Sequence, residues 1–200
     1  VKLASLSRDA FYAVNGLGFS SPEEFGKYMN EEYTNMINSV KKYGGFYVGR
    51  YETSLSNSVA KSQYNTTPMA SMNWYNMYYN QDSNRNTKNS YYGNTEIVSS
   101  MIWGSQWDAM LNWILDEGVD AKQVYTVTGN HSGSRRNTGV SGNDFANNVI
   151  DISANVIEWT QEANANKYRV YRGGNSYAGN SYTASNRNGN LPTYTDYYRG

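Results

Sequence analysis

The chain has 200 residues and a mass of 22.6 kDa, which is enough for one domain with a real core. Its 17 Lys and Arg balance 17 Asp and Glu, so we expect neither a nucleic-acid partner nor a basic membrane patch. Cysteine is absent and His131 is the single histidine, which excludes disulfides, thiol nucleophiles and most metal centres. No apolar run is long enough for a transmembrane segment, and the start at Val1 has no signal-peptide pattern, so we expect a soluble or already processed chain.

The composition favours surface recognition. The chain has 20 Tyr, 27 Asn and 22 Ser, with only 17% charged residues. Tyrosine supplies rigid contact area at low entropy cost, while Asn, Ser and Gly supply adaptable hydrogen bonds. The same polar, weakly charged composition is equally typical of loop-rich surface proteins of bacteria and viruses, so at this point both interpretations stand.

The first predicted helix covers residues 22–43. Ser21 is a suitable N-cap, and Glu24 is placed to close a capping box with it. Apolar residues then recur at helical spacing until Gly44 and Gly45 end the pattern. The next segment, 46–53, is rich in aromatic and β-branched residues, which predicts a core strand.

A second helix is predicted between Ser105, its candidate N-cap, and Gly118, which ends it, with one apolar stripe that faces the core. Residues 55–95 show neither a helical nor a strand period, and we predict a long loop there. Residues 129–143 are a second loop, rich in Gly, Ser and Asn. The stripe of the second helix consists of Trp107, Met110, Leu111, Ile114 and Leu115.

Short strands are predicted at 149–152, 156–160 and 168–171. Two helices, a few short antiparallel strands and long ordered loops together indicate an α+β fold. We treat residues 1–200 as one domain, with 1–20 as an N-terminal extension.

Catalytic motifs are hard to find. His131 lies in a Gly- and Ser-rich loop and lacks the sequence context of a hydrolase nucleophile, so no catalytic triad is predicted. Glu158 lies between Ile157 and Trp159, and we expect its side chain to be partly buried. A structural carboxylate, or a ligand of a structural cation with Asp151 and Asn155, is a simpler interpretation of Glu158 than a catalytic acid.

Residues 153–160 read Ser-Ala-Asn-Val-Ile-Glu-Trp-Thr, and residues 168–175 read Tyr-Arg-Val-Tyr-Arg-Gly-Gly-Asn. These two segments resemble the formylglycine-generating-enzyme (sulfatase-modifying-factor) family. The resemblance covers about residues 44–200 and implies a C-type-lectin-like fold. The family's closing Gly-Phe-Arg would begin where this chain stops, at Arg199 and Gly200, so the resemblance implies truncation or disorder beyond that point.

The resemblance does not carry the family's enzyme activity, because the positions of its active thiols are Ala178 and Thr183 in this chain. The calcium-dependent sugar-binding motif of true lectins is missing too, so the shared fold does not imply sugar binding. We predict no metal site, no cofactor and no catalytic residue. The same fold also occurs, without catalytic residues, in the variable proteins of diversity-generating retroelements. Their adenine-directed mutagenesis turns Asn codons into Tyr, Ser, Thr, Asp, Ala or Gly but not into Lys, Glu, Gln, Met or Trp.

Residues 164–200 fit that substitution pattern, since they contain one Lys and no Glu, Gln, Met or Trp. This resemblance implies a candidate variable region with two sets of residues. The scaffold set is Arg169, Val170, Arg172, Gly173, Gly174, Arg187 and Pro192. The displayed, ligand-binding set is Tyr171, Ser176, Tyr177, Ala178, Asn180, Tyr182, Asn188, Asn190, Tyr194, Asp196, Tyr197 and Tyr198.

The leading hypothesis is therefore a non-enzymatic binding protein, or adhesin, on a bacterial surface or a phage tail, with a protein or glycan ligand on a cell surface. One alternative is a carboxylate-dependent hydrolase of cell-surface polymer, with Glu158 or Glu52 as the acid. Another is a structural surface or tail protein whose loops mediate assembly. The sequence does not specify an oligomeric state.

Overall fold

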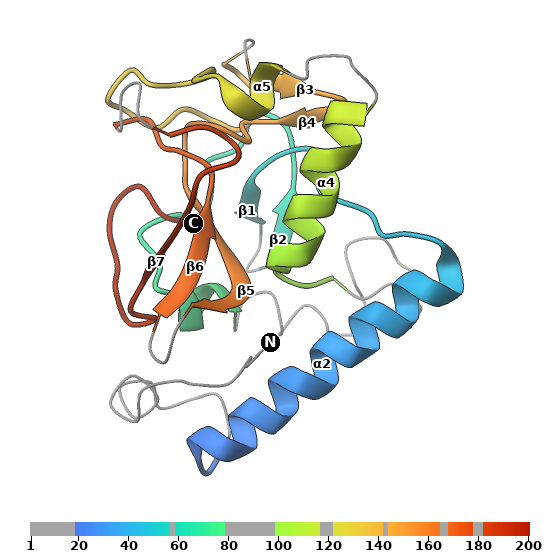
Figure 1. Ribbon diagram of the computed structural model, residues 1–200. Coiled ribbons are helices and arrows are strands. Elements are labelled where there is room, and N and C mark those ends of the chain that lie inside the picture. Colours follow the sequence, from blue (N-terminus) through green and yellow to red (C-terminus); the bar gives the residue numbers. More distant parts are fainter. Residues whose placement is uncertain are drawn as a thin grey trace.

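The computed structural model mixes helices with small antiparallel sheets, which is compatible with the expected α+β class (Figure 1). It describes residues 19–56, 59–78, 99–116, 122–141, 144–164, 168–177 and 182–200. Most of the predicted N-terminal extension lies outside these residues. The elements in chain order are α2 (Pro22–Tyr43), β1 (Thr53–Ser56), β2 (Val59–Ser62), α4 (Gly104–Asp116), α5 (Lys122–Tyr125), β3 (Phe145–Ala146), β4 (Val149–Ile150), β5 (Glu158–Asn164), β6 (Tyr168–Arg172) and β7 (Arg187–Asn190).

Helix α2 has the bounds that its caps predict. The Ser21 side chain accepts a hydrogen bond from the Glu24 N–H, and Gly44 adopts the left-handed conformation that closes the C-terminus on Val40. The capping box is displaced by one residue, because the Glu24 carboxylate accepts the N–H of Ser20 instead of that of Ser21. The helix buries Phe25 and Met29 in the core.

The predicted strand over 46–53 is wrong. The segment is irregular up to Thr53, where β1 begins, and the Tyr47 side chain is fully exposed. Aromatic and β-branched residues favour a strand only when a neighbouring strand pairs with them. Here the segment mainly connects α2 to β1. The Ile150 N–H of β4 donates a hydrogen bond to its Arg50 carbonyl at 2.9 Å.

The predicted loop over 55–95 is wrong in its first half. Strands β1 and β2 form a hairpin, with Thr53 opposite Ser62, and residues 74–78 are helical. The region contains many Ser, Asn and Thr residues, so the alternation of apolar and polar side chains does not reveal either element. Residues 79–98 lie outside the described part of the chain. Core side chains nevertheless come from this region: Met69, Trp74, Tyr75, Met77 and Tyr78.

Helix α4 is confirmed, although it begins at Gly104, so that Ser105 is inside the helix and not its cap. Its stripe is buried as predicted at Trp107, Met110, Leu111 and Ile114, while Leu115 is only partly covered. The predicted end at Gly118 lies outside the described residues. This stripe packs with Val124, Ala146, Val149, Ile152 and Ala184 in the smaller of two core clusters.

Three strands in the order β5–β6–β7 form the main sheet, and every pairing is antiparallel. Trp159 lies opposite Tyr171 across β5 and β6, and a bulge follows before Ala163 pairs with Arg169. The predicted strands at 149–152, 156–160 and 168–171 correspond to β4, β5 and β6 with shifted ends, and β3 and β7 were not predicted.

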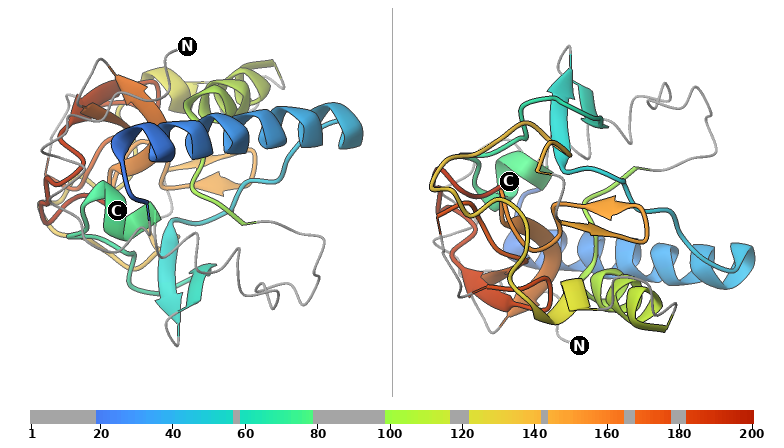
Figure 2. Two further views of the ribbon diagram at one scale, coloured as in Figure 1. Left: turned by 90° about the horizontal axis from the view of Figure 1, so that it is seen from below. Right: turned by 90° about the horizontal axis from the view of Figure 1, so that it is seen from above.

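The elements surround the main sheet from several sides. In Figure 2, α2 extends past the rest of the body at its C-terminal end, and the β1–β2 hairpin projects on the side away from α4. The C-terminus lies beside the helical residues 74–78. Among the described residues, no helix is long and apolar enough to cross a membrane.

Candidate functional site

The two segments that carry the family resemblance pack directly against each other. A Cβ on Gly174 would lie 2.4 Å from the carbonyl oxygen of Ser153. Gly173 has a φ of +72°, and a Cβ there would lie 2.7 Å from the Glu158 carboxylate. Only glycine permits these approaches without a shift of the backbone. The Arg-Gly-Gly turn is therefore needed to hold residues 153–158 in place.

Glu52 fixes the same segment from the other side. Its carboxylate accepts a hydrogen bond from the Asn155 side-chain N–H at 2.6 Å and one from the Val156 backbone N–H at 2.8 Å. Asn155 adopts a left-handed conformation, with a φ of +67°, which Asn tolerates better than most residues. Its side-chain oxygen accepts N–H groups from Asn130 and Arg136. This network ties the 130–136 loop to the buried segment.

Four carboxyl groups lie near one another around this network. Burial and the charge of Asp151 raise the pKa of Glu52 well above its usual value, and burial and the charge of Glu52 do the same for Glu158. Burial also raises the pKa of Asp144 to about 6, and it raises the pKa of Asp151. The Oε2 atom of Glu158 is buried without a hydrogen-bond partner.

The polar groups around Glu158 are largely engaged by other parts of the protein. Glu158 is partly buried, as predicted, and both oxygens of Glu52 already accept hydrogen bonds from the protein. In the described part of the chain, no group of three or more His, Asp or Glu is placed to hold a metal ion. The Asn155 amide is engaged by Glu52, Asn130 and Arg136, so it does not point toward a shared ligand with Glu158.

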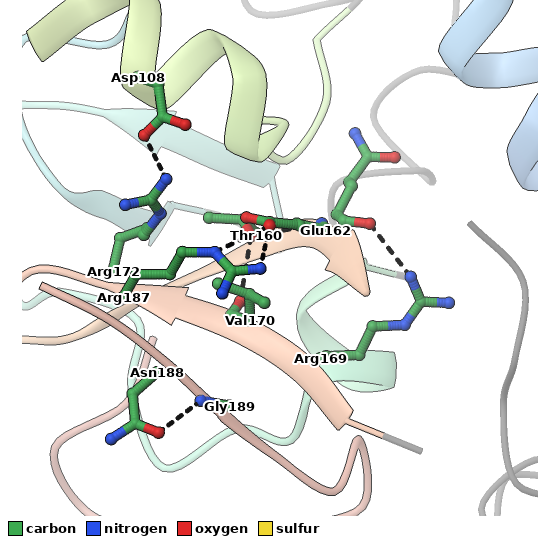
Figure 3. Close-up of polar contacts among 10 residues, drawn as sticks. Asp108, Thr160, Glu162, Arg169, Val170, Arg172, Arg187, Asn188 and Gly189 are labelled. Carbon is green, nitrogen blue, oxygen red and sulfur yellow. Dashed lines mark hydrogen bonds and ion pairs between the residues drawn. The ribbon is translucent and has the colours of Figure 1, made fainter. Parts of the chain in front are cut away.

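Arginines connect the main sheet to its surroundings (Figure 3). Arg172 forms an ion pair with Asp108 of α4, and Arg187 forms one with Glu162 of β5. Arg169 is buried and donates to the Gln161 carbonyl at 3.1 Å, while its guanidinium lies 4.2 Å from the centroid of the Trp74 ring. Loss of hydration lowers the pKa of Arg169 to about 10, so it stays charged at neutral pH.

The last residues of the chain extend this sheet along the outer edge of β5. Arg199 pairs in parallel with Ile157, and the Trp159 N–H donates to the Gly200 carbonyl at 2.8 Å. The Met72 and Trp74 N–H groups donate to the carbonyls of Arg199 and Pro192. Residues 192–200 are thus held at several points by backbone hydrogen bonds.

Arg199 also anchors this segment through its side chain. The guanidinium is buried, lies 4.4 Å from the centroid of the Tyr171 ring and 4.6 Å from that of Tyr194, and forms an ion pair with Asp196 at 3.2 Å. The Asp196 carboxylate in turn accepts the Tyr198 N–H at 2.7 Å. These contacts fix the backbone that carries Tyr197 and Tyr198.

Arg135, Tyr197, Tyr198 and Tyr177 form a continuous row of contacts, which we call the aromatic array. The Tyr177 ring stacks on Tyr198 with centroids 5.5 Å apart, and Tyr198 meets Tyr197 edge to face at 5.0 Å. The Arg135 guanidinium lies 3.8 Å from the centroid of the Tyr197 ring. Tyr177 is 72% exposed and Tyr197 is 51% exposed. The array is thus a pre-arranged surface built from two loops and the C-terminal segment.

His131 positions the loop that supplies Arg135. Its Nδ1 lies 3.0 Å from the Asn175 carbonyl oxygen, and its Nε2 lies 2.9 Å from that of Thr128. The Gly133 N–H donates to the Ser176 carbonyl at 2.7 Å. His131 is therefore a partly buried structural histidine in a loop docked against residues 175–177, and not a solvated one.

The structure separates the predicted ligand-binding residues into groups. Tyr171 and Ser176 are buried, at 6% and 0% exposure, so their assignment to the displayed surface is wrong. Tyr171 packs on Trp159 inside the larger core cluster, because its face of β6 is covered by other residues. Ser176 lies beneath the 130–136 loop, and its N–H donates to Asn155.

The other predicted residues are at least partly accessible. Tyr177, Asn188, Tyr194 and Tyr197 are exposed, and Tyr182, Asn190, Asp196 and Tyr198 are partly exposed. The structure brings Tyr177, Tyr197 and Tyr198 together. Among the described residues, no hydrogen bond or ring contact joins Asn188 or Asn190 of β7 to the array. Ala178 and Asn180 lie outside the described residues.

The predicted scaffold residues are mostly buried, as for Arg169, Val170, Arg172 and Pro192, whereas the Arg187 side chain is 42% exposed. Sequence analysis missed Arg135, because nothing in its local sequence shows that its loop folds back on residue 197. No protein-family model matches the chain, and no curated protein is significantly similar to it.

Proposed function

We propose that this protein is a non-enzymatic binding protein that presents its C-terminal face to a ligand on a cell surface. The aromatic array carries the proposal, because exposed, mutually packed tyrosines supply contact area with little loss of side-chain entropy on binding. The buried contacts of Arg199 and His131 hold the array in place before any ligand binds.

We also propose a C-type-lectin-like scaffold with a diversified C-terminal region, displayed outside the cell on a bacterium or on a phage tail. The resemblance of residues 153–160 and 168–175 supports the scaffold, and so does their close packing at Gly173 and Gly174. The composition of residues 164–200 supports diversification. The lost thiol positions support a role without catalysis.

The hydrolase alternative has less support. Both carboxylate oxygens of Glu52 already accept hydrogen bonds from the protein. The Oε2 atom of Glu158 is buried, so a polymer cannot reach it. The raised pKa values of both groups would suit a general acid, but burial with neighbouring carboxylates accounts for them without catalysis. Turnover of a polysaccharide panel that disappears in Glu158→Gln at unchanged thermal stability would favour the hydrolase.

The diversification part is tested in the encoding DNA. We expect a second, near-identical copy of the sequence for residues 164–200 near the gene, which differs from it only at adenines. The differing codons should include those of the exposed Tyr177 and Tyr197 and should spare those of the buried Arg169 and Val170. Absence of the copy, or differences spread over buried codons, would overturn diversification.

The binding part is tested with a panel of surface glycans and surface proteins. The double variant Tyr177→Ala/Tyr197→Ala should lose binding to whichever panel member the native protein binds, with a change in Tm of only a few degrees. Tyr47→Ala is the matched control, since Tyr47 is a fully exposed tyrosine in the segment before β1. A double variant that keeps its affinity would exclude the aromatic array as the binding face.

A further inference from the structure

We propose that the aromatic array binds an acidic oligosaccharide segment of a surface polysaccharide, with Arg135 on a sugar carboxylate and Tyr177 under a sugar ring. This inference rests on the proposed binding function and adds the chemical class of the ligand. The Arg135 end of the array supplies an ionic contact, and the Tyr177 end supplies a stacking contact.

The Arg135 end is suited to a carboxylate. Its guanidinium is stacked on Tyr197, and no hydrogen bond or ion pair joins this side chain to another described residue. Stacking leaves the N–H groups at the edge of the guanidinium plane unused. Those groups match the two oxygens of a carboxylate in a bidentate pair. The stacked ring restricts the side chain in advance, which lowers the entropy cost of forming that pair.

The charge around Arg135 is not cancelled by its neighbours in the array. Asp196 is the acidic residue beside Tyr197 in the sequence, and its carboxylate is already shared between Arg199 and the Tyr198 N–H. Arg136 is exposed, and its side chain has no hydrogen bond or ion pair to a described residue. Arg135 is partly exposed and Arg136 is exposed, so the loop carries two positive charges at the surface, which favours an anionic ligand.

The Tyr177 end is suited to a sugar ring. Tyr177 stacks on Tyr198 at an interplanar angle of 22° and remains 72% exposed, so one ring face is covered and the other is open. An open aromatic face is flat and carries the negative part of the ring quadrupole, which attracts the polarised C–H groups on a pyranose face. Hydroxyl groups of the sugar can remain in water at the rim.

The array consists of four side chains in successive contact, and this number of contacting groups favours an oligosaccharide over a single sugar. The successive separations from Tyr177 to Tyr198, Tyr197 and Arg135 are 5.5, 5.0 and 3.8 Å. The open Tyr177 face and the Arg135 guanidinium are therefore linked through the two intervening rings of Tyr198 and Tyr197. A chain with an acidic sugar in alternate or successive positions can contact both ends at once, which raises affinity by multivalent contact.

The experiment titrates the protein at low ionic strength with a hyaluronan hexasaccharide, in which glucuronate alternates with N-acetylglucosamine, and with hexasaccharides of galacturonate and mannuronate, and measures Kd by calorimetry. At least one uronate hexasaccharide should bind, and neutral chitohexaose should bind at least tenfold more weakly. An oligoglutamate peptide with the same number of carboxylates as the uronate hexasaccharide that binds tests the alternative of an acidic peptide ligand. This peptide should bind at least tenfold more weakly than that hexasaccharide. Affinity should fall as salt is added.

Matched variants separate the two ends of the array. Arg135→Gln and Tyr177→Ala should each weaken uronate binding at least tenfold, whereas Arg50→Gln and Tyr47→Ala, two exposed residues before β1, should leave Kd unchanged. Each variant is first checked for an unchanged Tm. If no uronate binds, if oligoglutamate binds equally well, or if Arg135→Gln keeps its affinity, the acidic-sugar assignment is overturned.

Failure of the inference is distinguishable from failure of the proposed function. If uronates do not bind but Tyr177→Ala/Tyr197→Ala still abolishes binding to a protein or neutral glycan of the panel, the binding face stands and only its ligand class is wrong. If a bound ligand is unaffected by the double variant, the proposed binding face itself is wrong.

Discussion

Gly174 lies so close to Ser153 that a side chain at position 174 would meet the Ser153 carbonyl oxygen at 2.4 Å. Tyr182 closes the same space from another side, with its Cβ 3.1 Å from the position of an added Cβ. Because both obstacles include backbone atoms, the site cannot relax by rotating a side chain. The turn after β6 and the segment before β5 therefore hold each other in place.

We predict that Gly174→Ala destabilises the protein by on the order of 2 kcal/mol or more, because the backbone must separate to admit one methyl group. Gly45→Ala is the control, since nothing lies within 4 Å of a Cβ at that position. Thermal unfolding followed by circular dichroism measures both. Equal Tm values for the two variants would contradict the close packing of the two segments.

The second prediction concerns Arg199, whose side chain lies under the aromatic array and contributes to the stability of the protein. Replacement of Arg199 by Met removes the guanidinium from between Tyr171 and Tyr194 and leaves Asp196 without its ion pair. We expect a loss of about 2–4 kcal/mol of stability. Arg199→Lys should recover only part of it, because an ammonium group cannot stack on two rings as a guanidinium does.

Hydrogen exchange checks the same prediction locally. In Arg199→Met, the amides of Trp159 and Gly200, which bond across the edge of β5, should exchange faster than in the native protein. Arg50→Met is the matched control at an exposed arginine. Native-like exchange at both amides would mean that the backbone hydrogen bonds alone hold the C-terminal segment.

The N-cap of α2 gives a third prediction. Ser21→Ala removes the side-chain acceptor of the Glu24 N–H and should cost about 1 kcal/mol. Ser39→Ala changes an exposed serine within the same helix and should stabilise by a few tenths of a kcal/mol, because Ala has the better helix propensity. Chemical denaturation measures both values. A Ser21→Ala protein of native stability would show that the Glu24 contact with Ser20 suffices as the cap.

The sequence predicted the elements that depend on local interactions. The bounds of α2 follow from Ser21, Pro22 and Gly44, each of which acts on its own helix end. The stripe of α4 likewise needs only the helical period. The strand over 46–53 failed because strand formation depends on a partner that the sequence does not reveal, and the β1–β2 hairpin was missed among polar residues.

The candidate site was predicted only in part, for the same physical reason. The resemblance implied that Tyr177 and Tyr197 are displayed, but it implied the same for Tyr171, which the structure buries against Trp159. The residue types in the segment 164–200 indicate which positions adenine-directed mutagenesis could have produced, and they do not indicate which face of a strand is covered. Arg135 joins the array through a loop docked by His131, which is a tertiary contact without a local signal.

The carboxyl groups around Glu52 reverse the usual dependence of stability on pH. Asp144 has a pKa of about 6 in the folded protein against 3.8 when unperturbed, so the folded state binds its proton more tightly than the unfolded state. Its contribution to stability is therefore complete below about pH 4 and is lost as the pH rises through about 6. The raised pKa values of Glu52, Asp151 and Glu158 act in the same direction.

We therefore predict that stability falls between about pH 4 and pH 7, by up to about 3 kcal/mol for Asp144 alone. Asp151→Asn should stabilise the protein at pH 7 and flatten this dependence, because it removes one charge from the cluster. Its amide oxygen can still accept the Gly139 N–H, and Asn tolerates the φ of +64° at this position. Asp116→Asn, in an exposed turn of α4, is the control and should leave the profile unchanged. Denaturant titrations from pH 4 to 8 measure the three profiles; stability that rises over this range in the native protein would contradict the clustering of ionised carboxylates.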